Sequence, residues 1–221
     1  MDSLTPSSMA LLLADARLPA AGHTQSAGVE PGLAHGLVAE ELRAYCRTRL
    51  ATVVRTEAAA AVVARHHALS GRSLAAVETA WAARTPSDAM RATARMLGRG
   101  LLRLARRAWP AAVAGWPAEA QPPRSLVLGA IAAETGLPAV ELARVVAYDD
   151  VQTVLSAALK LLPLDPADAT AWCVELLPAV DRLALEVSTL TATADIPATG
   201  SPHIEGWAQA HARTARRLFS A

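Results

Sequence analysis

The sequence predicts an all-α protein that folds as one globular domain of about eight to ten helices over residues 1–221. Hydrophobic residues make up 52% of the chain and aromatic residues only 4%, so alanine and leucine, which both favour helices, supply most of the apolar surface. Apolar residues recur at spacings of three and four along nearly every patterned segment. No segment alternates apolar and polar residues as a half-buried strand would.

Four helices are expected in the first part of the chain, over residues 7–16, 26–35, 38–69 and 73–83. Turn-forming residues close them, because proline and glycine do not continue a helix easily. Pro19 follows the first helix, Gly36 the second and Ser70-Gly71 the third.

The next helix, over residues 86–108, has a start signal in the sequence Thr-Pro-Ser-Asp at 85–88. The threonine is the expected hydroxyl cap, the proline the first helical residue, and the aspartate a carboxylate near the positive end of the helix. Residues 109–124 are rich in proline and are expected to form a linker, which is the candidate internal seam of the domain.

Helices are expected beyond the linker over residues 125–135, 138–162, 166 onward and 207–219. Gly136 ends the first of these, and Pro138 opens the second. Asp165 and Pro166 open the third, which Pro178 is expected to bend or break. The stretch before the last helix, residues 191–203, is expected to be a loop.

The charge balance and the apolar pattern exclude several classes of protein. The formal net charge is +1, so no overall field attracts nucleic acid or an anionic membrane surface. No stretch reaches the roughly 18 apolar residues of a membrane span, and the apolar core near residue 12 is shorter than that of a signal peptide. Cys46 and Cys173 lie far apart in apolar segments, which favours two buried free thiols and a cytoplasmic protein.

The stretch LPAAGHTQSAGVE, residues 18–30, is long and polar for a loop that follows an apolar helix. It makes a poor nucleophile elbow, because Thr24 stands where the first glycine is needed and a helix leads in instead of a strand. It also lacks the lysine and the glycine spacing of a phosphate-binding loop. A turn explains most of it, with Ser26 or Thr24 capping the next helix and Glu30 near its positive end.

No catalytic or metal-binding set is visible. The six histidines have no partner at the spacing of a zinc site, so a metal site would need assembly by the tertiary structure. Glu57 lies among apolar residues, where a paired core carboxylate is expected, and no second acid is visible near it as catalysis would require. We therefore predict no catalytic residue, no metal ligand and no cofactor.

An arginine stripe repeats every four residues along the helix expected over 86–108. Its members are Arg91, Arg95, Arg99, Arg103 and Arg107. The stripe is either a solvated face or a surface for an acidic protein partner, because arginine is favoured at interfaces. Gly98 and Gly100 lie in the same helix at a cost of about 1 kcal/mol each relative to alanine, which predicts that another backbone comes close.

The helix expected over 207–219 is amphipathic, with Trp207 and Phe219 on its apolar side. It either docks on the body of the protein or fits into a groove of a partner. Both interpretations stay open at this point.

Five ordered segments resemble the family of the urease accessory protein UreF. They are LLLADARLPAAGHTQSAGVE, ARMLGRGLLRL, GAIAAETGLP, LSAALKLLPL and SPHIEGWAQAHARTARRLF. Family-typical positions are filled by Pro19, Gly22, Ser26, Gly28, Glu30, Lys160, His211, Arg217, Leu218 and Phe219. The chain departs from the family pattern at Ala21, His23, Thr24, Asp165, Pro166 and Ala212, and over residues 149–152.

The resemblance implies an all-α, often dimeric protein that is not an enzyme and carries no dedicated cofactor. Proteins of this family bind UreD, also called UreH, and the GTPase UreG, and the complex delivers nickel to apo-urease while gating GTP hydrolysis. The family-typical residues, together with Arg95 and Arg99, are therefore the predicted partner-binding residues. Loop 18–30 would face a partner, the terminal helix would be offered to UreD, and Lys160 would communicate with the GTPase.

An alternative from another class is a helical ligand-binding or transcription-regulatory domain. That class would need a recognition helix and an apolar ligand pocket, and the sequence has no clear recognition helix. A small enzyme that uses assembled histidines is the third hypothesis.

Overall fold

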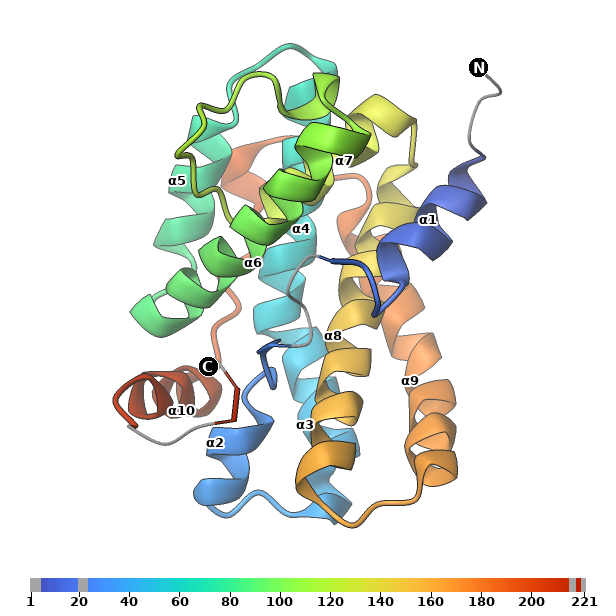
Figure 1. Cartoon of the computed structure of the whole chain (residues 1–221), viewed down its shortest axis with the longest axis vertical. Coiled ribbons are helices and arrows are strands. Elements are labelled where there is room, and N and C mark those ends of the chain that lie inside the picture. Colours follow the sequence, from blue (N-terminus) through green and yellow to red (C-terminus); the bar gives the residue numbers. More distant parts are fainter. Residues whose placement is uncertain (1–4, 20–23, 215–217, 220–221) are drawn as a thin grey trace.

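A computed structural model describes residues 5–19, 24–214 and 218–219 (Figure 1). These residues form ten α-helices and three short 3₁₀ turns, and no strand occurs among them. The helices are α1 (Pro6–Ala14), α2 (Val29–Ala34), α3 (Leu42–Ala51), α4 (Val53–Leu69), α5 (Ala75–Ala83), α6 (Asp88–Ala108), α7 (Arg124–Thr135), α8 (Ala139–Leu161), α9 (Pro166–Val187) and α10 (Pro202–Ala212). The 3₁₀ turns are η2 (Ala39–Glu41), η3 (Ala111–Val113) and η4 (Thr193–Asp195). The predicted all-α domain of about eight to ten helices is confirmed.

The central helix is α4, which contacts α3, α5, α7, α8 and α9 (Figure 1). Its residues 58–64 are alanines and valines, and each is at most 2% exposed. Small side chains let the neighbouring helices come close. Gly129 of α7 lies so near that an added Cβ would be 2.5 Å from the carbonyl oxygen of Ala61. The alanine-rich run therefore allows close packing of α4 against α7.

The other helices pack in layers around this centre. Helices α8 and α9 lie side by side, and α6 packs on α7 (Figure 1). Helix α10 contacts both α6 and α2. Helix α10 is thus packed against elements from the first half of the chain.

The helix expected over residues 38–69 is divided at Thr52, so that prediction is wrong. Thr52 has φ −120° and ψ −99°, outside the helical region, and it separates α3 from α4. Its carbonyl oxygen accepts a hydrogen bond from Thr199 Oγ1 at 2.9 Å, and Thr56 Oγ1 donates to the carbonyl oxygen of Pro197 at 3.0 Å. The break lets the loop after α9 form a hydrogen bond with the backbone of Thr52. Such a long-range contact cannot be predicted from the local sequence.

The start of α6 also differs from the prediction. Ser87 is the cap instead of Thr85, because its Oγ accepts a hydrogen bond from the N–H of Met90 at 3.3 Å and the helix begins at Asp88. Thr85 is buried ahead of the helix, and the guanidinium of Arg91 contacts its carbonyl oxygen. This side-chain contact keeps Thr85 outside the helix.

Pro178 does not break α9, which is continuous over Pro166–Val187. A proline removes the N–H that would bond to the carbonyl oxygen four residues earlier, here that of Val174. Both residues are exposed, so water can satisfy this carbonyl group. The expected break therefore does not occur, and the expected bend at Pro178 stays a prediction.

The last helix spans residues 202–212, so the prediction of a helix over 207–219 is wrong at both ends. Pro202 is the first helical residue, and the side chain of Glu205 accepts a hydrogen bond from the N–H of Ser201 at 3.0 Å. These contacts extend the helix into the expected loop. Leu218 and Phe219 are not helical, because their backbone N–H groups bond elsewhere, as described below.

Several local predictions are confirmed. Helix α7 ends at Gly136, which has φ 71°, and Pro138 stands immediately before α8. Cys46 and Cys173 are buried free thiols. Burial raises the pKa of Cys46 to about 12, so this thiol stays protonated at neutral pH.

The linker over residues 109–124 packs against α6. Arg106 donates a hydrogen bond to the carbonyl oxygen of Pro117 at 2.5 Å. A Cβ added to Gly98 would overlap the carbonyl oxygen of Pro122, which confirms that another backbone approaches this glycine. The linker as an internal seam stays a prediction.

Candidate functional site

The loop over residues 18–30, called the opening loop from here on, has a buried end that is held by α3. Tyr45 donates a hydrogen bond from its hydroxyl to the carbonyl oxygen of Ala27 at 2.7 Å. Gly28 has φ 80°, and a Cβ there would lie 2.5 Å from the Tyr45 hydroxyl oxygen, so both conformation and space require glycine. Ser26 Oγ accepts a hydrogen bond from the N–H of Glu30 at 3.3 Å. The N-cap residue of α2 is Gly28, with no side-chain cap bond, so the helix expected over 26–35 begins later than predicted and Ser26 is not its cap residue. The Ser26 hydroxyl nevertheless accepts one N–H of the first turn.

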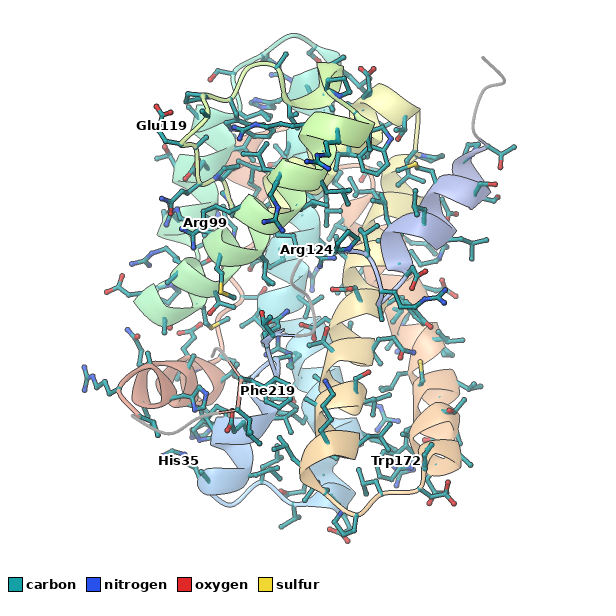
Figure 2. The ribbon with its side chains drawn as sticks, in the orientation of Figure 1. His35, Arg99, Glu119, Arg124, Trp172 and Phe219 are labelled. Atoms are coloured by element: carbon teal, nitrogen blue, oxygen red, sulfur yellow. The ribbon has the colours of Figure 1, made fainter. Side chains whose placement is uncertain are left out.

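The side chain of Glu30 reaches the other end of the chain. Its Oε1 accepts a hydrogen bond from the N–H of Leu218 at 2.8 Å, and its Oε2 accepts one from the N–H of Phe219 at 2.9 Å. The Nε2 atom of His211 lies 3.1 Å from the carbonyl oxygen of Phe219. We call Glu30, His211, Leu218 and Phe219 the C-terminal clasp. All four are predicted partner-binding residues, and the structure brings them together. Figure 2 labels Phe219 among them.

Lys160 lies next to the C-terminal clasp. Its Nζ is 5.3 Å from the centroid of the Phe219 ring, a cation–π contact. Both residues line a groove of about 240 Å³, together with the end of α1 and Gln25 of the opening loop. Lys160 is exposed, whereas Phe219 is 7% exposed. The opening loop, the single lysine and the C-terminal segment therefore meet at one groove.

The remaining predicted partner-binding residues are distributed differently. Pro19 is exposed after α1. Arg95 forms an ion pair with Glu78 at 2.8 Å and lies over the ring of Trp81. Outside the described residues lie Gly22 and Arg217, as well as the departures from the family pattern at Ala21 and His23.

The arginine stripe has two parts. Arg91 and Arg95 contact groups of the chain itself. Arg99, Arg103 and Arg107 are exposed, and Figure 2 labels the first of them. A solvated face and a surface for an acidic partner both remain compatible with these three arginines.

A cavity of about 120 Å³ lies between the opening loop and the core helices. Two ion pairs line it: Arg49 donates from Nε and Nη2 to Asp150 at 2.8 and 2.6 Å, and Arg124 donates from Nη1 to Asp149 at 2.6 Å. Glu57 lines the same cavity. Asp149 and Asp150 therefore lie around the same cavity as Glu57. The sequence did not reveal these acids near Glu57, because they belong to α8 and are far from it in the chain.

Glu57 is held by a neutral donor. Trp81 donates a hydrogen bond from Nε1 to Glu57 Oε1 at 2.6 Å. Burial raises the pKa of the Glu57 carboxyl group, and the Trp81 hydrogen bond only partly opposes this. The expected paired core carboxylate therefore has a tryptophan as its hydrogen-bond partner.

Replacing Glu57 by glutamine is expected to weaken the dependence of stability on pH. The raised pKa means that the native state holds this proton more tightly than the unfolded chain does. Between the ordinary value of 4.5 and the raised value, the wild-type free energy of unfolding therefore falls as the pH rises. Glutamine keeps a carbonyl oxygen for the Trp81 N–H but has no proton to lose. Urea unfolding measured across this pH range should show a smaller fall for the variant.

The matched control for this prediction is Glu119→Gln in the exposed linker, which should leave the pH profile of the wild type unchanged. A Glu57→Gln profile that runs parallel to the wild type would contradict the assignment.

Sequence reasoning missed the residues that hold this region in place. Tyr45, Arg49 and Arg124 contact the opening loop or its neighbours from the core. One signal was available: Arg49 lies at helical spacing from Leu42, Tyr45 and Cys46, on the buried face of α3, where a charge needs a partner. The identity of that partner, Asp150, depends on how α3 packs against α8.

Across ranges 5–19, 24–214 and 218–219, no three histidine, cysteine, aspartate or glutamate side chains gather as a metal site. None of the helices in these ranges has both the length and the apolar character needed to cross a bilayer.

Comparisons with known proteins agree with the sequence resemblance. A family model described as UreF matches residues 38–177. A urease accessory protein UreF from Mycobacterium sp. (strain JLS) is 40% identical over 216 residues, which cover 95% of this chain and 96% of that protein. Its counterpart from Mycolicibacterium vanbaalenii is 36% identical over 213 residues, with 95% and 96% covered. The one from Mycobacterium marinum is 36% identical over 222 residues, with 98% and 100% covered.

An all-helical chain that is similar to these proteins over nearly its whole length is an accessory protein of urease and not the catalytic subunit. Within that class, the chain belongs to the UreF family. The sequence resemblance is thereby confirmed, and the alternative of a transcription-regulatory domain gains no support.

Proposed function

We propose that this chain is a non-catalytic scaffold of nickel-dependent urease maturation in the cytoplasm. It binds UreD, also called UreH, and the GTPase UreG, and it pairs with a second copy of itself in a complex that delivers nickel to apo-urease. A scaffold can shift the state of a partner only if it binds one state more tightly than the other. The chain therefore modulates GTP hydrolysis by differential binding to the states of the GTPase.

The observation that carries this proposal is the convergence of family-typical residues from separate elements. Glu30 belongs to α2, Lys160 to α8, His211 to α10 and Phe219 to the C-terminal segment. All four meet around one groove or at its edge. A groove built from distant segments depends on the whole fold, which suits a surface that partners recognise.

Exposed side chains suggest how partners are held. Leu218 is 77% exposed, and its neighbour Phe219 lies beside the cation of Lys160, so the surface suits a partner with an apolar pocket and an acid. The exposed arginines of α6, such as Arg99, suit an acidic partner surface. In this proposal Leu218 binds UreD, and Lys160 communicates with the GTPase.

Removing residues 215–221 is expected to abolish co-purification with UreD, with a loss of at least about tenfold. The segment that carries Leu218 and Phe219 would be missing, whereas α10 would remain. A longer deletion that starts at residue 207 is unsuitable, because Trp207 packs against Gly32 of α2. The measurement is recovery of the variant on tagged UreD, with circular dichroism as the test of folding.

The control is Leu69→Ser, which removes an exposed leucine at the end of α4 and should leave co-purification unchanged. Undiminished recovery of the shortened chain on UreD would refute the role of this segment.

A further inference from the structure

Part of the arginine stripe of α6 has no partner among the described residues. We call this part the arginine surface, and its members are Arg99, Arg103 and Arg107. All three side chains are exposed, and within the described part of the chain none of them forms a hydrogen bond or an ion pair. The rest of the stripe is engaged, because Arg91 contacts the carbonyl oxygen of Thr85 and Arg95 pairs with Glu78. Only the arginine surface is therefore available to another molecule.

Other arginines at the surface of this fold are neutralised by acids of a neighbouring helix. Arg43, Arg55 and Arg144 are partly exposed, and each forms an ion pair with a carboxylate of α9. The arginine surface has no such carboxylate within the described residues. Like charges four residues apart in a helix repel each other, so these three positive charges lack a counter-charge in the isolated chain.

The linker that packs on α6 carries one acid, Glu119, but this acid does not neutralise the arginine surface. Glu119 is exposed and forms no ion pair with any described residue. Figure 2 shows Glu119 away from Arg99. The positive charge of the surface therefore faces solvent without an acid of the linker.

The arginine surface lies on a rigid support. Its members are four residues apart, so their Cα atoms are spaced about 6 Å along the helix axis. The linker fixes the outer side of α6, because Arg106 donates a hydrogen bond to the carbonyl oxygen of Ala118 at 3.0 Å. A backbone that is ordered before binding loses less conformational entropy when a partner binds. The spacing of the three charges is therefore set in advance.

We propose that the arginine surface docks an acidic face of a protein partner, with carboxylates about 6 Å apart. A guanidinium group can bind a carboxylate through two parallel hydrogen bonds. An acidic protein is favoured over nucleic acid because the formal net charge of the chain is only +1, whereas nucleic-acid-binding domains are usually strongly basic. The identity of the partner as UreD or UreG rests on the proposed function, whereas the recognition of carboxylates does not.

Titration of the full chain with a short glutamate-rich peptide tests this recognition without any partner protein. The NMR resonances of the Nε–H groups of the arginine surface are expected to shift. The shifts should largely vanish when salt is raised to about 0.5 M, because exposed charges are then screened. In Arg99→Glu/Arg103→Glu the peptide should bind at least about tenfold more weakly. Equal binding of the peptide by this variant would overturn the recognition of carboxylates.

A DNA duplex with the same number of charges as the peptide separates carboxylates from phosphates. It should bind the arginine surface no more tightly than the peptide does. Binding of the duplex at least about tenfold tighter than that of the peptide, and lost in Arg99→Glu/Arg103→Glu, would overturn the acidic protein as the occupant in favour of nucleic acid.

Recovery on tagged UreD and on tagged UreG tests the arginine surface in the assembled complex. Arg99→Glu/Arg103→Glu should be recovered at least about tenfold less well on one of the two proteins, since two like-charged faces then meet. Circular dichroism should stay helical. Undiminished recovery of this variant on both proteins would overturn the docking.

The matched control is Arg47→Glu/Arg72→Glu, which makes the same charge change at two exposed arginines outside α6. Its recovery on UreD and UreG, and its affinity for the peptide, should equal those of the wild type. An equal loss in this control would show that net charge is responsible and would overturn the assignment to α6. If the wild-type chain binds neither protein, the proposed function fails, while the peptide titration still decides on the arginine surface.

Discussion

Replacing Asp150 by alanine is expected to lower the free energy of unfolding by about 3–5 kcal/mol. Arg49 is 7% exposed and donates two hydrogen bonds to the two oxygens of Asp150. Burial acts to lower the pKa of Arg49, but the charge of Asp150 more than compensates and holds it above its usual value. Without Asp150 the guanidinium would stay charged and buried without its counter-ion. The loss should appear as a lower midpoint in urea unfolding.

Two control variants separate the buried ion pair from a general charge effect. Glu175→Ala breaks an ion pair with Arg43 whose side chains are 47% and 42% exposed, and it should cost less than about 1 kcal/mol. The double variant Arg49→Met/Asp150→Leu should recover most of the lost stability, because no charge is then left unpaired. A loss below about 1 kcal/mol for Asp150→Ala alone would show that water reaches Arg49 freely.

The same ion pair supports the opening loop. Arg49 Nη1 lies 3.5 Å from the hydroxyl oxygen of Tyr45, and that hydroxyl holds the carbonyl oxygen of Ala27. Asp150→Ala should therefore also loosen the loop next to Gly28. The residues at 149–152, where the chain departs from the family pattern, are thus used here for ion pairs with α3 and α7.

Replacing Gly98 by alanine is expected to destabilise the protein by about 1–3 kcal/mol, although alanine favours helices. The added Cβ would overlap the carbonyl oxygen of Pro122 and lie 2.9 Å from the carbonyl carbon of Pro123. The third neighbour is the backbone nitrogen of Arg124 at 3.0 Å. These are all backbone atoms, which cannot rotate away as a side chain can. The linker must therefore move off α6, and urea unfolding should report the cost.

Gly206→Ala in α10 is the matched control, because a Cβ at that position meets no atom within 4 Å. It should stabilise the protein by up to about 1 kcal/mol through helix propensity. If Gly98→Ala stabilised the protein equally, the close approach of the linker to α6 would be wrong.

The helices were largely predictable, because their signals are local. The ends of α7 and α8 depend on Gly136 and Pro138, which act on their immediate neighbours, and both predictions are confirmed. One error falls where a distant contact decides the local conformation, because Thr52 leaves the helix beside the loop that contains Thr199. The error at the start of α6 is local, because Ser87 caps the helix instead of Thr85, two residues earlier.

The residues of the candidate site could be predicted from the sequence, but their arrangement could not. Resemblance to the UreF family singled out Glu30, Lys160, His211 and Phe219 without showing that they meet. Local reasoning assigned Glu30 to the positive end of a helix, and it does lie in the first turn of α2. Its oxygens also bind backbone groups as far as 189 residues away in the chain. The local interpretation considered only the neighbours of Glu30 in sequence, so it missed this contact.

The sequence by itself determined an all-α fold, because the spacing of apolar residues and the turn-forming residues act within a few positions of each other. It also determined, through the order of its motifs, the family to which the chain belongs. Only the tertiary structure decided that the C-terminal segment closes onto Glu30 and that Arg49 pairs with Asp150. These contacts join residues that are far apart in the chain, and their partners become identifiable only when the packing of the helices brings the side chains together.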